Sequence, residues 1–153
     1  MEQKYKKNKK LIDIECLGFD NEAPPAECPL LLTHIAAGFP SPADDYTEQK
    51  LDLNEHLIKH PAATFFVRVE GNSMIDAGIK SGDILIVDRA LPVSNGAVVV
   101  AHIQGEFTVK RVEHRDNQLY LVPANNNYSP LLVTPEMDIE IWGVVSYVIH
   151  KVT

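Results

Sequence analysis

From Thr64 onward the sequence consists of short apolar runs separated by turn residues, and this pattern restricts the fold more than any other feature. The runs are rich in valine, isoleucine and phenylalanine, which favour strands. Gln104-Gly105 separates two of the runs and predicts a β-hairpin. Many short strands joined by Gly, Pro and Asn turns predict a mainly β fold of barrel-like or sandwich type. We expect strands at residues 65–69, 83–87, 97–103, 107–112, 118–122 and 139–149.

The N-terminal part of the chain has a different composition. Residues 1–29 combine a lysine run with closely spaced prolines, which block helices and inner strands, so we expect weak structure there. Residues 30–37 are apolar and short enough to pair as a strand, and the following Gly-Phe-Pro ends the run. Further on, the spacing of Leu53, Leu57 and Ile58 predicts a short helix near 53–59, ended by Pro61.

The charge of the chain is distributed unevenly. The net charge is −7, but residues 1–10 carry +4 and the remainder carries −11. Because an acidic body repels phosphate, we expect no direct sequence-specific DNA binding by the domain. No apolar run approaches the ~20 residues of a membrane-spanning helix. Asp13 and Glu15 interrupt the apolar stretch that a signal peptide needs after its basic head. We therefore expect a cytoplasmic protein without a membrane segment.

The cysteines and histidines form no pattern typical of a metal or disulfide site. Cys16 and Cys28 fit neither a disulfide framework nor a C-x-x-C metal knuckle. His56 and His60 are four residues apart, as two zinc ligands on a helix would be, but the glutamate of H-E-x-x-H is missing. We interpret both histidines as surface residues and expect neither a metal nor a cofactor.

A serine follows directly after a predicted strand and a glycine, in Gly71-Asn72-Ser73-Met74. A tight turn at this glycine can expose both the hydroxyl and successive backbone N–H groups. The N–H groups of Asn72 and Ser73 are therefore candidates to bind an oxyanion. Considered alone, a serine in such a segment most often belongs to an ordinary turn.

Lys110 gives this serine a possible chemical partner. Within the predicted strand 107–112, Lys110 lies on the same face as Thr108 and Val112. If that face is buried, desolvation lowers the pKa of the lysine, and an uncharged lysine can take a proton from a serine hydroxyl without a histidine–carboxylate pair. The alternative is a lysine on an edge strand, surrounded by water.

Together these segments resemble the LexA-type self-cleaving serine peptidases, and the UmuD branch most closely. The resemblance covers roughly residues 30–150. It rests on Gly-Asn-Ser-Met at 71–74, Gly-Glu-Phe-Thr-Val-Lys-Arg at 105–111, Gly-Phe-Pro-Ser-Pro at 38–42 and Asp-Ile-Leu-Ile-Val-Asp at 83–88.

The resemblance implies a peptidase fold of short strands in curved, barrel-like sheets, with a serine–lysine dyad. Ser73 would be the nucleophile and Lys110 the general base. The chain would cut itself between Ala37 and Gly38, which divides it into a flexible arm, 1–37, and a peptidase domain, 38–153. Cleavage would be stimulated by a RecA filament on single-stranded DNA. The product would form a homodimer and serve a UmuC-like error-prone lesion-bypass polymerase in the SOS response.

Three other functions are alternatives to this one. A LexA-like transcriptional repressor needs a helix-turn-helix before the cut, and 37 proline-containing residues do not supply one. A signal-peptidase-like enzyme would need a membrane anchor. A non-catalytic interaction module of the same fold stays open, because the sequence alone does not tell an active dyad from an idle one.

Overall fold

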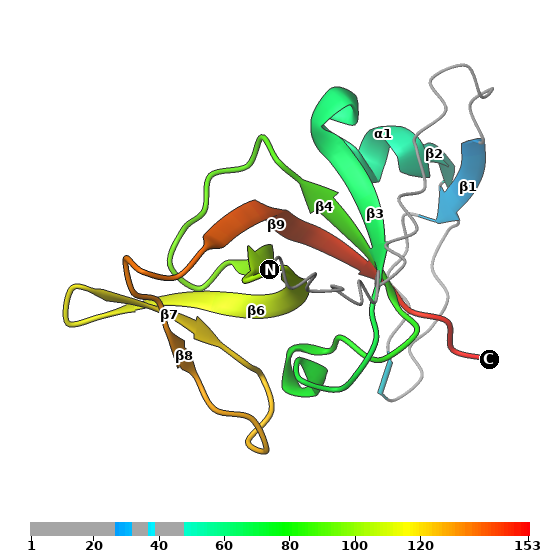
Figure 1. Cartoon of the computed structure of the whole chain (residues 1–153). Helices are drawn as coiled ribbons and strands as arrows, with labels where there is room; N and C mark the ends of the chain where they lie inside the picture. Colours follow the sequence, from blue (N-terminus) through cyan, green and yellow to red (C-terminus); the bar gives the residue numbers. More distant parts are fainter. Residues whose placement is uncertain (1–26, 32–36, 39–47) are drawn as a thin grey trace, which may run out of the picture.

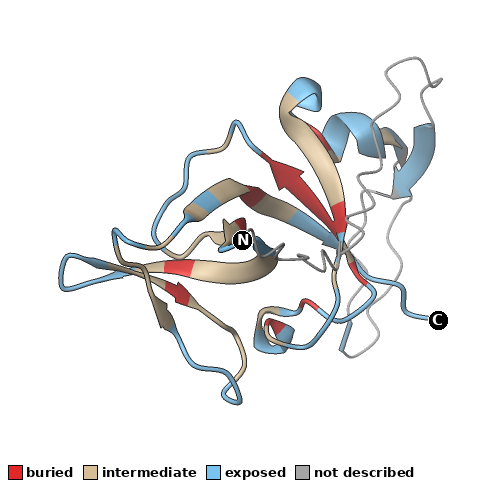
Figure 2. Cartoon of the chain, in the orientation of Figure 1, coloured by how far each residue is buried: buried red, intermediate tan, exposed pale blue. Residues whose placement is uncertain are grey.

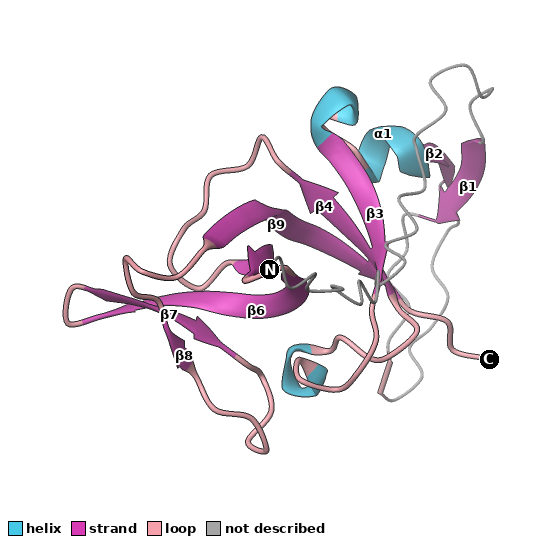
Figure 3. Cartoon of the chain, in the orientation of Figure 1, coloured by secondary structure: helices cyan, strands magenta, loops and turns pink. Residues whose placement is uncertain are grey.

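The computed structural model describes residues 27–31, 37–38 and 48–153. Within this part of the chain the architecture is mainly β (Figure 3), as the sequence predicts. The elements are β1 (Glu27–Leu31), β2 (Glu48–Asp52), α1 (Leu53–Leu57), η1 (Pro61–Ala63), β3 (Thr64–Arg68), η2 (Ile75–Ala77), β4 (Ile84–Asp88), β5 (Val98–Ile103), β6 (Glu106–Arg115), β7 (Gln118–Val122), β8 (Leu131–Leu132) and β9 (Ile139–Ile149), where η1 and η2 are short 3-10 helices.

Seven of the strands form one antiparallel sheet (Figure 1). The order across it is β3-β4-β9-β5-β6-β7-β8, so β9, the last strand in the sequence, lies between β4 and β5. Register shifts between Ile86 and Val87 and between Val100 and Ala101 interrupt the regular pairing with β9. The sheet ends at β3 and β8, which do not pair with each other, so it is open and not a closed barrel.

Two hairpins on either side of β6 are closed by two-residue turns. Gln104 and Gly105 join β5 to β6, with φ of 49° and 93°. Asp116 and Asn117 join β6 to β7, with φ of 48° and 61°. Two successive positive φ angles are typical of type I′ turns, whose twist matches that of paired strands. The predicted hairpin at Gln104-Gly105 is therefore confirmed, with Ile103 opposite Glu106.

Two clusters of buried apolar side chains pack on the sheet, one on each face. The buried residues, red in Figure 2, lie largely on its strands. On one face Val67, Leu85, Val87 and Val100 pack with Met74 and Ile79, which come from the chain between β3 and β4. On the other face Val99, Ala101, Val112, Leu121 and Val144 form a second cluster. Because Val99 and Val100 belong to opposite clusters, β5 is a central buried strand, and the sheet gives the loop after β3 a rigid base.

The N-terminal elements differ most from the sequence predictions. Strand β1 begins at Glu27, three residues earlier than the expected strand, so the expectation of weak structure was wrong for residues 27–29. Pro29 lies within β1, which pairs only with β2 in a two-stranded sheet, and proline is tolerated in such an edge strand. Helix α1 ends at Leu57, earlier than predicted, and the Asp52 side chain caps its start by accepting a hydrogen bond from the Asn54 backbone N–H at 2.8 Å.

Some sequence predictions lie outside the described residues. These are the basic head, Cys16 and the rest of residues 1–26, most of the apolar run at 30–37, and the segment 39–47.

Candidate active site

Ser73 lies in the loop that follows β3, and a glycine permits the turn that exposes it. Gly71 has a φ of +91°, a conformation that L side chains rarely adopt. Its backbone N–H donates to Ser81 Oγ at 3.2 Å. Directly after the serine, the Met74 side chain is 2% exposed and packs in the core. The loop therefore holds Ser73, which is half-buried, between a tight turn and the buried side chain of Met74.

A second segment holds the same loop from outside. Asn125 donates from Nδ2 to the backbone oxygen of Asn72 at 2.8 Å, and the Asp76 backbone N–H donates to the Ala124 oxygen at 2.8 Å. Nothing in the sequence around Asn125 indicates a contact with a residue 53 positions earlier. It is a positioning residue that pattern analysis missed.

Lys110 comes from β6 and meets Ser73 directly. Its Nζ lies 3.0 Å from Ser73 Oγ, although the two residues are 37 apart in sequence. The same nitrogen lies 2.7 Å from Thr108 Oγ1 and 3.0 Å from the Val109 backbone oxygen. The structure thus brings together the two side chains that the sequence singled out, and adds Thr108 as a neighbour.

The surroundings of Lys110 favour the uncharged amine. On this face of β6, Val112 is 1% exposed and Thr108 and Lys110 are half-buried, so the face is partly buried at the site. Burial lowers the pKa of Lys110 below its ordinary value, because removing water penalises the ammonium form. An uncharged amine at hydrogen-bond distance from a hydroxyl can accept the hydroxyl proton. The arrangement is therefore chemically suited to activate Ser73.

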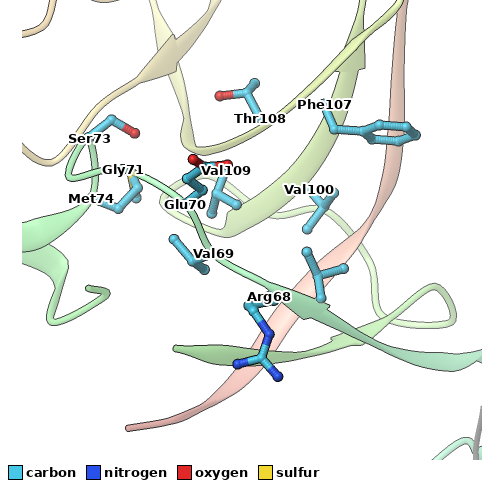
Figure 4. A pocket seen from close by; sticks show the side chains of 11 residues that line it. Arg68, Val69, Glu70, Gly71, Ser73, Met74, Val100, Phe107, Thr108 and Val109 are labelled. Carbon is cyan, nitrogen blue, oxygen red and sulfur yellow. The ribbon is translucent and has the colours of Figure 1, made fainter. Parts of the chain in front are cut away.

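A cavity of about 310 Å³ adjoins the serine (Figure 4). In this view the Ser73 and Thr108 hydroxyls point toward each other. Apolar side chains make up most of the wall: Val67, Val69, Met74, Val100, Phe107 and Val109. Arg68 and Glu70 add charge to it. The cavity beside Ser73 is therefore mainly apolar.

The residues of the expected cut do not lie at this site. Ala37 and Gly38 are exposed, and neither lines the cavity. No heavy atom lies within 4 Å of the position that a Cβ on Gly38 would take. The cleavage site at Ala37–Gly38 therefore stays a prediction.

Two histidines contact buried aspartates away from the serine. His60 Nδ1 lies 2.6 Å from Asp88 Oδ2, and His150 Nδ1 lies 2.6 Å from Asp83 Oδ1. Burial alone would raise the pKa of the Asp83 carboxyl, but the hydrogen bonds from His150 and the Lys80 backbone, with the charges of both residues, lower it overall. Asp83 also accepts the Val69 backbone N–H at its own backbone oxygen, 2.9 Å away. Asp83 therefore contacts both His150, which directly follows β9, and Val69, which precedes the Ser73 loop.

The fold and the serine–lysine contact agree with a comparison against known protein families. Residues 29–146 match the family described as Peptidase S24-like, and the chain belongs to this family.

Curated relatives match over most of their own length. Protein MucA of Salmonella typhimurium is 48% identical over 120 residues, which is 78% of this chain and 82% of MucA. Protein ImpA of Shigella flexneri is 50% identical over 123 residues, 80% of this chain and 83% of ImpA. Protein SamA of Salmonella typhimurium is 46% identical over 132 residues, 86% of this chain and 91% of SamA.

In the part of the chain that the structure describes, no helix has the length and apolar character needed to cross a membrane.

Proposed function

We propose that this chain is a serine peptidase that cleaves itself, with Ser73 as nucleophile and Lys110 as general base. The observation that supports this most strongly is the 3.0 Å contact between Lys110 Nζ and Ser73 Oγ in a partly buried site. Membership of a peptidase family agrees with it.

The hydrogen-bond partners of Lys110 suit this role. An uncharged lysine has two N–H donors and one lone pair. The Val109 oxygen can only accept, and Thr108 Oγ1 can accept as well, so these two neighbours occupy both donors. The lone pair is then left for the Ser73 hydroxyl, which donates its proton to Nζ. Thr108 acts in this proposal as a positioning residue for the amine.

The reaction then proceeds in two steps. Ser73 Oγ attacks the carbonyl carbon of Ala37 while its proton moves to Lys110, and the backbone N–H groups of Asn72 and Ser73 bind the oxyanion. In this turn the backbone hydrogen bonds are donated by the N–H groups of Ile75 and later residues. This agrees with the assignment, because it leaves the N–H groups of Asn72 and Ser73 for the oxyanion. The Lys110 ammonium then protonates the departing nitrogen of Gly38. Water, with Lys110 again as base, hydrolyses the ester between Ala37 and Ser73.

The proposed cut separates an arm, residues 1–37, from the domain, residues 38–153. Alanine is small enough for a narrow site, and glycine lets the backbone bend onto the nucleophile. Because the scissile bond is tethered to its own enzyme, no intrinsic affinity for substrate is needed. A partner that favours docking of the arm would speed cleavage by shifting the population of docked chains.

We further propose that the processed domain is a homodimeric accessory subunit of a UmuC-like error-prone lesion-bypass polymerase. In this role the chain acts in the cytoplasm during the SOS response, and a RecA filament on single-stranded DNA stimulates its cleavage. Identity of 46–50% to MucA, ImpA and SamA supports this assignment. The strongly acidic composition after residue 10 supports a role through protein partners, since direct DNA binding is disfavoured.

The test is incubation of the purified chain at pH ~10, where more lysine is uncharged, and separately with activated RecA filament at neutral pH. Mass spectrometry should find a fragment that begins at Gly38. Ser73→Ala and Lys110→Ala variants should yield none, with circular dichroism unchanged. An intact wild-type chain under both conditions would contradict the peptidase proposal and leave the non-catalytic module as the function.

A further inference from the structure

A second cavity, of about 480 Å³, lies on the Lys110 side of β6. Its wall is formed by Ile103, Gln104, Glu106, Phe107, Thr108, Lys110, Leu121 and Leu131. Phe107 and Thr108 also line the first cavity, so the two cavities adjoin each other. Ser73 lines only the first cavity and Lys110 only the second. The pair of catalytic side chains therefore marks the boundary between them.

The direction of proton transfer decides which half of a substrate enters each cavity. A general base that takes the serine proton must deliver it to the leaving nitrogen. That nitrogen belongs to the residue after the cut, so it has to approach Lys110 Nζ. The residues after the cut then continue on the Lys110 side, and the residues before the cut lie on the Ser73 side.

We propose that the cavity beside Lys110 is the binding site for the segment after the cut, and that it selects the aromatic ring of Phe39. This inference rests on the proposed cleavage between Ala37 and Gly38. Gly38 has no side chain, so Phe39 is the first side chain after the cut. An extended chain advances ~3.3 Å per residue, which keeps Phe39 within reach of a cavity that begins at Lys110.

The wall of the cavity suits such a ring. Leu131 and Ile103, both half-buried, supply apolar surface, and Leu121 lies behind them at 1% exposed. Phe107 lines both this cavity and the first one. Four polar side chains also line the cavity: Gln104 and Glu106 at the end of the β5–β6 hairpin, and Thr108 and Lys110 beside Ser73. An aromatic side chain can therefore place its ring against Leu131 and Ile103 while its backbone stays near Lys110.

The first test compares cleavage rates of the full chain carrying Phe39→Ala or Phe39→Leu. We expect Phe39→Ala to slow cleavage by about tenfold or more, because the ring loses its buried contact, and Phe39→Leu to fall between this variant and the wild type. The dependence of the rate on pH should keep its midpoint, since Lys110 is untouched. Equal rates for all three chains would overturn the inference. A wild-type chain that does not cleave would instead contradict the proposed function.

The second test places the ring without relying on catalysis. In a Ser73→Ala chain with Cys16 and Cys28 changed to serine, Phe39→Cys is combined with either Leu131→Cys or Leu132→Cys. Leu132 is the matched control, because it is the adjacent residue of β8 and lines a different cavity, with Asn117 and Thr134. Glutathione disulfide should cross-link the variant at position 131 and not the one at 132. Equal cross-linking of both, or preference for position 132, would refute the assignment.

Discussion

Replacing Gly143 by alanine should destabilise the domain, because the sheet has no room for a methyl group there. Gly143 lies in β9 opposite Val100 of β5. A Cβ at this position would stand 2.7 Å from Val87 Cγ1 and 3.2 Å from the Asp88 backbone oxygen. Val87 is 0% exposed, and a β-branched side chain has little rotamer freedom, so the clash cannot be relieved by a simple rotation. Overpacking of this kind costs about 1–3 kcal/mol.

Urea unfolding of a Ser73→Ala background, which avoids self-cleavage, measures this cost. Gly143→Ala should lower the free energy of unfolding by about 1–3 kcal/mol. Val87→Ala alone should lower it by about 2 kcal/mol, through lost packing. The double variant should lose less unfolding free energy than the sum of the two single losses, by at least about 1 kcal/mol. The reason is that the smaller side chain at position 87 makes room for the new methyl group. Additive effects, or a Gly143→Ala chain as stable as its parent, would refute the steric reasoning.

Three further predictions concern the site and its supports. Lys110→Met should abolish cleavage yet leave the domain at least as stable as its parent at neutral pH, because no ammonium is desolvated on folding. A urea midpoint below that of the parent would contradict this. Asp83→Asn should remove part of the acid sensitivity of folding. The folded-state pKa of Asp83 is lowered, so the stability that its carboxylate contributes is present above the ordinary aspartate value of 3.8 and is lost as pH falls through the folded pKa. A variant whose urea midpoint falls between neutral and acid pH as much as the parent's would count against this. Asn125→Ala removes the hydrogen bond to the Asn72 backbone oxygen and should slow cleavage by about tenfold or more, with about 1 kcal/mol of lost stability. A wild-type cleavage rate in this variant would show that the hydrogen bond does not position Ser73.

Where strands are apolar and bounded by turn residues, the sequence predicts them well. Strands β7 and β9 have the predicted bounds, and β3, β4 and β5 are shifted by a single residue at one or both ends. Two strands were missed for identifiable reasons. Strand β2, with the sequence Glu-Gln-Lys-Leu-Asp, lacks apolar alternation, and β8 is only two residues long. Both form through pairing with a neighbour, which local sequence does not report.

The site was predictable only in part. The alternation of side chains along β6 places Lys110 with Thr108 and Val112, and this predicts desolvation of the amine. No local pattern predicts that Lys110 meets Ser73 across 37 residues; the resemblance to a family supplied that expectation, and the distance of 3.0 Å agrees with it. The contact of Asn125 with Asn72 also depends on tertiary structure, since two loops must converge to form it.

The central claim, that an uncharged Lys110 takes the proton of Ser73, is tested most directly by the pH at which Lys110 loses its own proton. Nitrogen-detected NMR of a ¹⁵N-lysine-labelled Ser73→Ala chain measures this titration without self-cleavage, and a Lys110→Arg variant assigns the resonance. We expect Lys110 to have a pKa below the ordinary lysine value of ~10.4, at the same pH as the midpoint at which the wild-type cleavage rate rises. A Lys110 that titrates at or above the ordinary value, or a cleavage rate that does not follow its titration, would contradict the account.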